Sequence, residues 1–279
     1  MIRDVLAARL AALAASDTTP DYQLLAREVL GIRGASAALA RRLIEQALVV
    51  EDRRDHWRRI GEHVRAEAPR AAGVYVFRDA DERALYVGKA ANLRRRLHTH
   101  FADRRWRTLH TAVARVARVD WQTTGSELEA LLMEATLIAE LQPAANVHIG
   151  EPAMRTRAVP RALVRDVAVI LPSIKPDAVD VVAARERGDV MLLHVDRSGT
   201  TLVDDSARLW MFFDHAADRT DQSRAGLALA PLVFSWIAGR GRHATRLDPH
   251  DAANAGELAT RLAALIGDTS LFVERLVHV

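Results

Sequence analysis

Residues 73–101 contain the pattern that most constrains what this chain can fold into. Gly73 to Arg78 is a short run of β-branched and aromatic residues, and Ala84 to Val87 is a second apolar run that also contains a tyrosine. Between them, Asp79-Ala80-Asp81-Glu82 has the polar composition of a turn. Two such runs joined by a short polar segment predict a β-hairpin.

A helix is predicted directly after the hairpin. Gly88 is expected to end the second strand, and Asn92 can cap the helix that follows it. The residues of the buried face of this helix recur every four positions and are Leu93, Leu97 and Phe101. Arg96 and His100 are also four residues apart, so we expect them to share a different face.

A longer helix is predicted from Gly125 to Leu141, after a third strand at Asp120 to Thr124. Ser126 and Glu129 have the spacing of a capping box at its start. Pro143 is expected to end it, because proline cannot continue a helix. This segment therefore adds a third strand and a second long helix to the hairpin.

Glu134 falls on the apolar stripe of this longer helix. The apolar members of the stripe are Leu131, Ile138 and Leu141. A carboxylate among apolar side chains costs several kcal/mol unless it meets a cation, a metal ion or hydrogen-bond donors. Two interpretations are open for Glu134: an ion pair with a nearby arginine, or a metal ligand. Glu127 and Glu140, near the helix ends, are expected to face water.

Lysine is nearly absent from the chain. Of the 39 Lys and Arg residues, only Lys89 and Lys175 are lysines. The chain uses arginine for almost every positive charge, so Lys89 suggests a position where an ammonium does something that a guanidinium cannot, such as lowering its pKa. The alternative is that Lys89 is there by chance.

The composition excludes several classes of protein. The chain contains no cysteine, which rules out disulfides and thiolate metal sites. No stretch reaches the ~18 consecutive apolar residues that a membrane helix needs. The first ten residues are interrupted by charges and lack the apolar core of a signal peptide. We therefore expect a cytoplasmic protein without a membrane partner.

Residues 1–64 are predicted to be helical. The expected helices are Val5 to Leu13, Asp21 to Leu30, Ala37 to Leu48 and Arg53 to Val64. The glycine turn before Ala37 gives the outline of a helix-turn-helix, and Val49-Val50-Glu51 could begin a wing. Two interpretations are open: DNA binding, or a packing and spacer role.

Residues 149–279 are predicted to form a separate α+β unit. The expected strands are Val167 to Leu171, Val179 to Ala183 and Val190 to Val195, with helices at Ser206 to Ala216, Leu227 to Ala238 and Ala255 to Ile266. The basic segment Gly239-Arg240-Gly241-Arg242-His243 is either a solvated loop or a phosphate contact. The sequence does not predict the role of this unit.

The polar residues of the central segment fit phosphodiester hydrolysis. They are Tyr75, Tyr86, Lys89, Arg96, His100, Glu134 and Asn146. A carboxylate can hold a divalent metal ion, and an arginine can clamp the non-bridging phosphate oxygens with paired donors. A tyrosine can act as a base only where cations favour its phenolate. Lys89, three residues after Tyr86 across the expected Gly88 turn, is placed to favour it.

The paired motifs Gly73-Val74-Tyr75 and Tyr86-Val87-Gly88 resemble those that name the GIY-YIG nuclease family. The segments around Lys89 to Leu97, Glu129 to Glu134 and Pro143 to Asn146 are similar to the N-terminal, 3′-incision nuclease half of excinuclease C. The resemblance covers roughly residues 68–148. No RNase H-like nuclease or helix-hairpin-helix pattern follows residue 150, so the chain looks more like the single-nuclease homologues.

The resemblance implies a role for each residue of the set. Tyr86 becomes the general base or the residue that orients the water, with Tyr75 beside it and Lys89 tuning it. Arg96 binds the scissile phosphate, Glu134 holds a single Mg²⁺ or Mn²⁺ ion, and Asn146 lines the site. The residues expected to contact DNA are Asn92, Arg94, Arg95 and Arg96. His100 stands where excinuclease C usually has a tyrosine, so it can share or take over the base role.

The resulting prediction is an α+β protein with three parts. Residues 65–148 form a GIY-YIG nuclease domain, a three-stranded antiparallel sheet with flanking helices, between a helical region at 1–64 and the unit at 149–279. The predicted function is a metal-dependent DNA endonuclease that nicks DNA in repair or processing. The predicted partners are DNA and either excinuclease B or a proofreading-type exonuclease. The alternatives are a non-catalytic DNA-binding scaffold with an inherited nuclease fold, and an RNA substrate.

Overall fold

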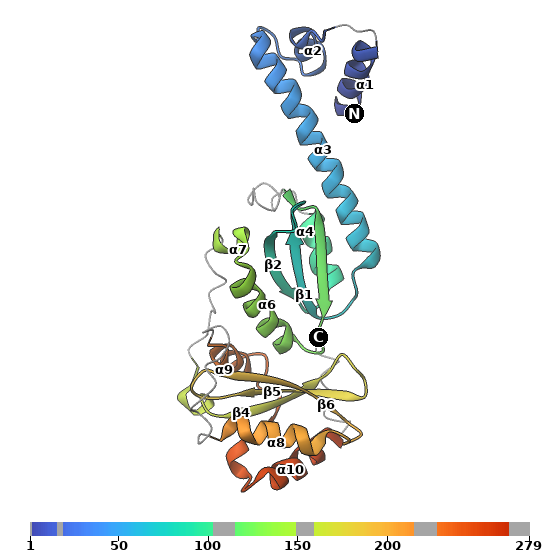
Figure 1. The fold of residues 1–279 in the computed structure, drawn as a ribbon. Helices are drawn as coiled ribbons and strands as arrows, with labels where there is room; N and C mark the ends of the chain where they lie inside the picture. The colour runs from blue at the N-terminus through green and yellow to red at the C-terminus, as the bar shows by residue number, and fades with distance from the viewer. Residues whose placement is uncertain (1, 16–18, 103–114, 149–158, 215–227, 268–279) are drawn as a thin grey trace.

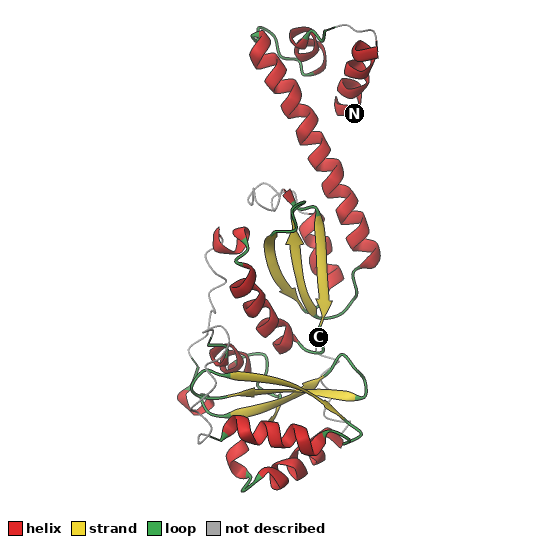
Figure 2. Cartoon of the chain, in the orientation of Figure 1, coloured by secondary structure: helices red, strands yellow, loops and turns green. Residues whose placement is uncertain are grey.

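The computed structural model describes residues 2–15, 19–102, 115–148, 159–214 and 228–267 of the 279-residue chain (Figure 1). Helices and two separate antiparallel sheets make up the fold, which confirms the predicted α+β class (Figure 2). A small helical bundle comes first, a three-stranded sheet follows, and a four-stranded sheet comes last. Within the described ranges, no helix has the length and apolar composition needed to cross a bilayer.

The N-terminal bundle consists of α1 (Ile2–Ala15), α2 (Tyr22–Val29) and the first turns of α3 (Ala37–Glu67). Its buried residues are Leu6, Leu25, Ala26, Ala40 and Ile44. Asp21 caps α2, because its Oδ1 accepts from the backbone N–H groups of Gln23 and Leu24. The first two predicted helices are confirmed.

Helix α3 is continuous over 31 residues, or about 46 Å at 1.5 Å per residue. The predicted break after Leu48 and the wing from Val49 to Glu51 are therefore wrong. No glycine or proline occurs between Ala37 and Ile60, so nothing in this stretch interrupts the helical hydrogen bonds. The distal end of α3 packs Trp57, Ile60 and Val64 into the core beside the first sheet.

The first sheet has the strand order β2-β1-β3, formed by β1 (Gly73–Arg78), β2 (Ala84–Ala90) and β3 (Arg118–Thr123). All pairings are antiparallel, which confirms the hairpin and the third strand. The prediction that Gly88 ends the second strand is wrong, because Gly88 pairs with Tyr75 inside the ladder. A Cβ at Gly88 would lie 2.5 Å from the Tyr75 hydroxyl oxygen, so the glycine makes room for that ring.

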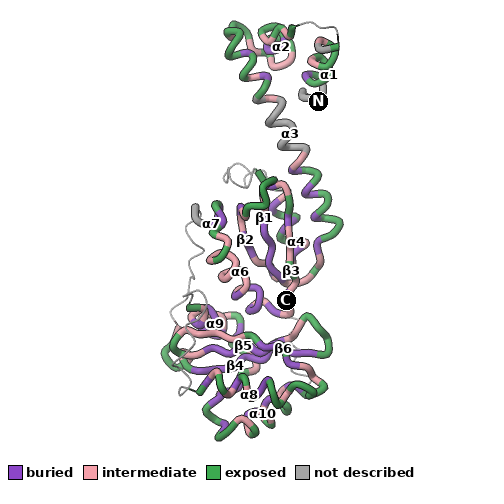
Figure 3. The backbone as a smooth tube through the Cα atoms, in the orientation of Figure 1, coloured by how far each residue is buried: buried purple, intermediate pink, exposed green. Residues whose placement is uncertain are grey.

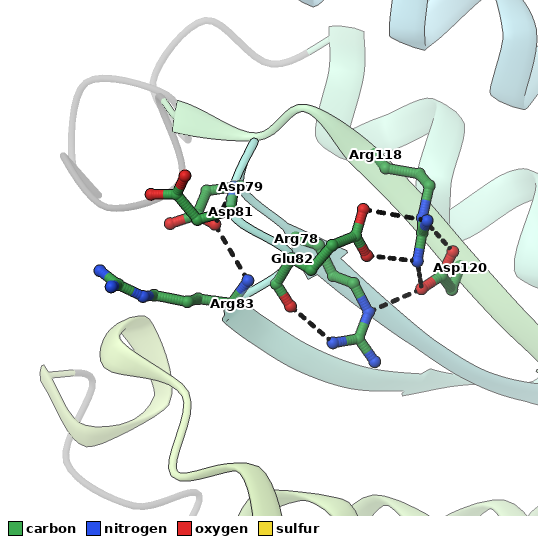
Figure 4. A network of polar contacts seen from close by, with 7 residues as sticks. All are labelled: Arg78, Asp79, Asp81, Glu82, Arg83, Arg118 and Asp120. Carbon is green, nitrogen blue, oxygen red and sulfur yellow. Dashed lines mark hydrogen bonds and ion pairs between the residues drawn. The ribbon is translucent and has the colours of Figure 1, made fainter.

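A network of charged side chains stabilises the end of this sheet where the turn joins β1 to β2 (Figure 4). Asp79 Oδ1 accepts from the backbone N–H groups of Asp81 and Arg83, which closes the predicted hairpin turn. Arg78 Nε donates to Asp120 Oδ2 at 2.7 Å, joining β1 to β3. Arg118 bridges Glu82 in the turn and Asp120 in β3. The register of the hairpin is thus fixed from its closed end.

Two helices cover opposite faces of the first sheet. On one face lies α4 (Leu93–Ala102), whose Leu93 and Leu97 are fully buried. On the other face lies α6 (Glu127–Leu141), followed by the short α7 (Ala144–His148). Asn92 Oδ1 accepts from the Arg95 N–H, and Ser126 Oγ accepts from the Glu129 N–H, so both predicted caps form. The Glu129 carboxylate completes its cap on the N–H of Gly125.

The second sheet has the order β6-β5-β4-β7 and is antiparallel throughout. Its strands are β4 (Val167–Pro172), β5 (Ala178–Ala184), β6 (Val190–Asp196) and β7 (Thr245–Leu247), and the 3₁₀ turns η2 (Arg161–Leu163) and η4 (Pro249–Asp251) flank it. Helices α8 (Leu202–Phe213) and α10 (Ala255–Gly267) cover one face. Helix α9 (Ala230–Ala238) covers the other. The three predicted strands are confirmed, and β7 was not predicted.

Helix α6 belongs to the cores of both sheets. Its Ala130, Met133 and Leu137 pack against β1 and β2. Its Leu128 and Leu132 pack against β4, β5 and α9. Figure 3 shows buried backbone along both sheets and along the helices that face them. The apolar stripe predicted for this helix is therefore divided, since Leu131 contacts the second core while Ile138 and Leu141 contact the first.

Candidate active site

Two tyrosines lie side by side on the face of the first sheet that α4 covers. Tyr75 of β1 and Tyr86 of β2 have ring centroids 6.0 Å apart. Tyr75 is fully buried, and its hydroxyl forms a 2.6 Å hydrogen bond with Nε2 of His100 from α4. The structure thus brings together the two predicted tyrosines and the histidine that replaces a third.

Arg96 approaches the hydroxyl groups of both tyrosines from α4, one helical turn before His100. Burial alone would lower the pKa of Arg96, but the two tyrosine hydroxyls outweigh it and raise the pKa. The side chain is otherwise exposed, so its charge remains accessible to a ligand from solvent. An arginine in this position can offer paired donors to a phosphate.

Both tyrosines are held in the neutral form. Burial raises the pKa of Tyr75 well above its ordinary value of 10.0. Burial also raises the pKa of Tyr86, Glu134 adds to the effect, and Arg96 only partly opposes it. A preformed phenolate at Tyr86 is therefore disfavoured in the metal-free protein.

The expected influence of Lys89 on Tyr86 has no support in the structure. Because β2 continues past Gly88, residues 86 and 89 point to opposite faces of the sheet. Lys89 is also absent from the groups that shift the pKa of Tyr86. Its own pKa is lowered, as its rarity suggested: burial lowers it, Glu134 opposes this, and Arg240 and Arg96 add to the lowering.

Glu134 reaches the open edge of the first sheet from α6. Its Oε1 accepts from the backbone N–H of Lys89 at 2.9 Å, a group that points outward because β2 is an edge strand. Burial raises the pKa of Glu134, while Lys89 and Arg96 oppose the rise. No ion pair formed among the described residues includes Glu134, which disfavours the ion-pair interpretation.

The chemistry around Glu134 fits a magnesium-type ion held through few protein ligands. No group of three or more His, Asp or Glu residues in the described part of the chain could hold a metal ion. Magnesium keeps several of its water ligands and is often bound by one or two carboxylates together with substrate phosphates. Glu134, with one oxygen hydrogen-bonded to backbone, supplies a carboxylate of that kind.

Asn146 serves the same strand edge in a different way. Its Oδ1 accepts from the N–H of Val87 at 2.8 Å, and its Nδ2 donates to the carbonyl of Val87 at 2.9 Å. The buried amide thus replaces a neighbouring strand at the position next to the Glu134 contact. In this arrangement Asn146 holds the edge of β2 and leaves the position beside Lys89 to Glu134.

Glu127 is a residue of this region that the sequence did not indicate. Its side chain is only 25% exposed, so the expectation that it faces water is wrong. Its Oε1 lies 3.6 Å from Nζ of Lys89 and also contacts the guanidinium of Arg240. Arg240 is 113 residues away in sequence. No local pattern could have indicated this pairing.

The residues predicted to contact DNA divide into two groups. Arg94 donates to the backbone carbonyls of Ala68, at 2.6 Å, and Ala66, at 3.4 Å, and so ties α4 to the end of α3. Asn92 is used as the cap of α4. Arg94 and Asn92 therefore form the group whose side chains hold α4 in place. Arg95 and Arg96 form the exposed group.

The sheet of three antiparallel strands, the two motif tyrosines and the carboxylate from the long helix define a GIY-YIG domain. The family model that matches residues 71–147 is described as the UvrC-like GIY-YIG domain. Residues 71–147 are thus a GIY-YIG domain of the UvrC-like type.

Curated relatives agree over the same segment. The UvrABC system protein C of Paenarthrobacter aurescens is 46% identical over 83 residues, which cover 29% of this chain and 12% of that relative. The protein of the same name from Methanothermobacter thermautotrophicus is 37% identical over 83 residues, covering 30% of this chain and 14% of that relative. The chain thus matches less than a sixth of the length of these relatives.

Among solved structures, the N-terminal GIY-YIG endonuclease domain of UvrC from Thermotoga maritima, bound to magnesium as its catalytic divalent cation, matches this chain with 26% identity. The match covers 31% of this chain and 94% of that domain, with a TM-score of 0.28.

Proposed function

We propose that this chain is a divalent-metal-dependent endonuclease that hydrolyses a phosphodiester bond of DNA. The observation that carries the proposal is that Arg96 from α4 and Glu134 from α6 both act on Tyr86 of β2, although the two helices cover opposite faces of the sheet. The match of residues 71–147 to a UvrC-like GIY-YIG domain supports it. We assign the nuclease to residues 65–148, flanked by 1–64 and 149–279.

Each side chain of the site has a role in this proposal. Arg96 binds the non-bridging oxygens of the scissile phosphate and offsets the charge that develops there. Glu134 holds one Mg²⁺ or Mn²⁺ ion, which supplies Lewis-acid stabilisation of the phosphate and the leaving oxygen when bound. Lys89 adds a compact positive charge beside them. Asn146 keeps the edge of β2 in place for Glu134.

Tyr86 is proposed to orient the attacking water through a neutral hydroxyl group. The raised pKa of Tyr86 favours this role over that of a preformed phenolate. Tyr75 is hydrogen-bonded to Nε2 of His100, so the proton that the water loses can pass to the Tyr75 hydroxyl oxygen as Tyr75 gives its own proton to Nε2. His100 therefore takes part through Tyr75, since its own side chain is buried and hydrogen-bonded to the Tyr75 hydroxyl.

The test is nicking of supercoiled plasmid with Mg²⁺ or Mn²⁺. We expect the wild-type chain to convert supercoiled to open-circular DNA and a chelator to abolish the conversion. Glu134→Gln is expected to lower the rate on the order of 10²-fold or more, as for loss of one group that stabilises a transition state. Glu140→Gln is the matched control, because Glu140 is an exposed carboxylate on the same helix. Equal nicking by Glu134→Gln and the wild type contradicts the metal site, whereas DNA binding without nicking favours the scaffold alternative.

We further propose that the nick is made in cytoplasmic DNA excision repair. The support is the similarity of residues 71–147 to proteins named for the UvrABC system. The test is incision of plain, lesion-bearing and branched duplexes with and without excinuclease B. Preferential incision of lesion-bearing DNA in the presence of excinuclease B is the expected result, and incision indifferent to both contradicts the repair role.

A further inference from the structure

The basic segment 239–243 forms a fixed turn between α9 and β7. The N–H groups of Gly239 and Gly241 both donate to the carbonyl of Trp236, at 3.1 and 2.8 Å. The N–H of Ala244 donates to the carbonyl of Gly241 at 2.9 Å. A Cβ at Gly241 would collide with the ring of Trp236, so the turn lies directly on that side chain. Arg240 is thus presented from a backbone with little freedom to move.

Arg240 lies beside the nuclease site although it belongs to the C-terminal unit. Its guanidinium contacts Oε1 of Glu127, the same oxygen that Nζ of Lys89 approaches at 3.6 Å. Glu127 precedes Glu134 by seven residues on α6, which places the two carboxylates two helical turns apart on one side of the helix. The side chain of Arg240 is 71% exposed, so a ligand from solvent can reach it.

Two cations contact this carboxylate, and a third acts on one of them. Arg96 comes from α4, Lys89 from β2 and Arg240 from the turn after α9, and both arginines act on the charge of Lys89. Glu127 is the acidic group that Lys89 and Arg240 share. The side chain of Arg240 is exposed although Glu127 is largely buried, so a phosphate from solvent can reach Arg240 and compete with the carboxylate.

We propose that Arg240 is a DNA-backbone contact that the C-terminal unit adds to the nuclease surface. In this arrangement Arg240 adds a phosphate contact to the positive charges of Arg96 and Lys89. Glu127 occupies the place of that phosphate in the free protein. The inference rests on the proposed nuclease function and adds the C-terminal unit to its substrate-binding surface.

The test is the salt dependence of duplex DNA binding, measured on the full chain with a chelator present so that no cleavage occurs. Each phosphate contact contributes about −0.9 to the slope of log K against log salt on duplex DNA. We expect Arg240→Gln to weaken binding and to make this slope about 0.9 less steep. Arg240→Lys should keep the slope. Arg208→Gln on α8 is the matched control, because Arg208 is exposed and pairs with Asp205 on its own helix.

Glu127→Gln is expected to change DNA affinity in the opposite direction to Arg240→Gln. If the carboxylate competes with phosphate, Glu127→Gln should tighten DNA binding, and the gain should shrink in the Glu127→Gln/Arg240→Gln double variant. A plain structural role for Arg240 would instead lower nicking without changing the salt slope.

The outcomes separate the two proposals. An unchanged affinity and slope in Arg240→Gln, while Arg96→Gln weakens binding, overturns the role of Arg240 and leaves the nuclease intact. Lower nicking by Arg240→Gln with an unchanged slope overturns it as well. A wild-type chain that neither binds nor nicks DNA contradicts the proposed function itself.

Discussion

At the scale of single residues, the buried pair of Tyr75 and His100 makes a specific prediction. Tyr75→Phe removes the hydroxyl that hydrogen-bonds Nε2 of His100 and leaves a buried ring nitrogen without that partner. We expect a loss of about 1–3 kcal/mol in the free energy of unfolding. Chemical denaturation measures it. The double variant Tyr75→Phe/His100→Leu should recover part of the loss, because it removes the buried ring nitrogen that Tyr75→Phe leaves without the hydroxyl. Additive losses in the double variant contradict the coupling.

Asn146 makes a second prediction of this kind. Asn146→Ala removes both partners of the Val87 backbone at the edge of β2. We expect a loss of about 1–3 kcal/mol in unfolding free energy and faster hydrogen exchange at the Val87 amide. Asn92→Ala is the control, since it removes the cap of α4 and should leave Val87 exchange unchanged. Unchanged exchange at Val87 in Asn146→Ala would mean that the amide does not protect the strand edge.

The sequence indicated most of the residues at the site but not all their neighbours. Glu134 stood out because a carboxylate on an apolar stripe is costly, whereas the roles of the tyrosines, Arg96 and His100 followed from the resemblance to the GIY-YIG motifs. The position of Lys89 was misjudged, because glycine often ends a strand and here it makes room for the Tyr75 ring instead. The contact between Glu127 and Arg240 depends on how two sheets pack, which no local spacing encodes.

At the scale of elements, α6 has an unusual contact with the second sheet. Glu129 of α6 is only 8% exposed, and Asp180 of β5 is fully buried. Asp180 Oδ1 is paired with Nδ1 of His194 at 2.6 Å, whereas its Oδ2 has no hydrogen-bond partner within the described residues. The pKa of Glu129 is raised by burial and by the charge of Asp180, against the N–H of Gly125 and the charge of His194. Protonation of Glu129 would let its carboxyl group donate a hydrogen bond to Asp180.

This contact predicts a pH dependence of stability. Because the pKa of Glu129 is raised in the folded state, its contribution to stability is complete below the unfolded value of 4.5 and is lost as pH rises through the folded pKa. Glu129→Gln should remove this loss, since the amide can donate to Asp180 and still accept from Gly125. We expect the variant to melt a few degrees higher than the wild type near neutral pH, with a difference that shrinks in acid. A difference that does not vary with pH contradicts the raised pKa of Glu129.

Helices and strands differed in how well the sequence predicted them. The hairpin, α4 and α6 followed from apolar spacing and caps, because each helix has its own start signal at Asn92 or Ser126. The break predicted in α3 was wrong, because Val49-Val50-Glu51 was interpreted as the start of a wing although no glycine or proline interrupts the helix there. The three-residue strand β7 has too little pattern to stand out, and its pairing with β4 depends on the folded sheet.

At the scale of the whole molecule, α6 joins the first sheet to the second sheet because it belongs to the cores of both. A fragment of residues 1–148 would expose Leu128 and Leu132, which the second sheet buries. We expect this fragment to unfold at a lower temperature and to aggregate, because large apolar patches on a free surface associate. Removal of residues 1–36 is the control, since the bundle that they complete has a core of its own. A fragment 1–148 as stable and soluble as the full chain contradicts the dependence on α6.

The position of Lys89 also has a consequence for chemistry applied from outside. Lys89 and Lys175 carry the only side-chain primary amines of the sequence, and Lys175 lies exposed in the turn between β4 and β5. The lowered pKa of Lys89 leaves more of its amine in the nucleophilic, uncharged form at a given pH than an ordinary lysine has, while its partial burial limits access to reagents. Acylating reagents therefore meet an exposed amine at Lys175 and a partly buried amine at Lys89. The rate of acylation of Lys89 relative to Lys175 reports whether the site around Glu134 is covered.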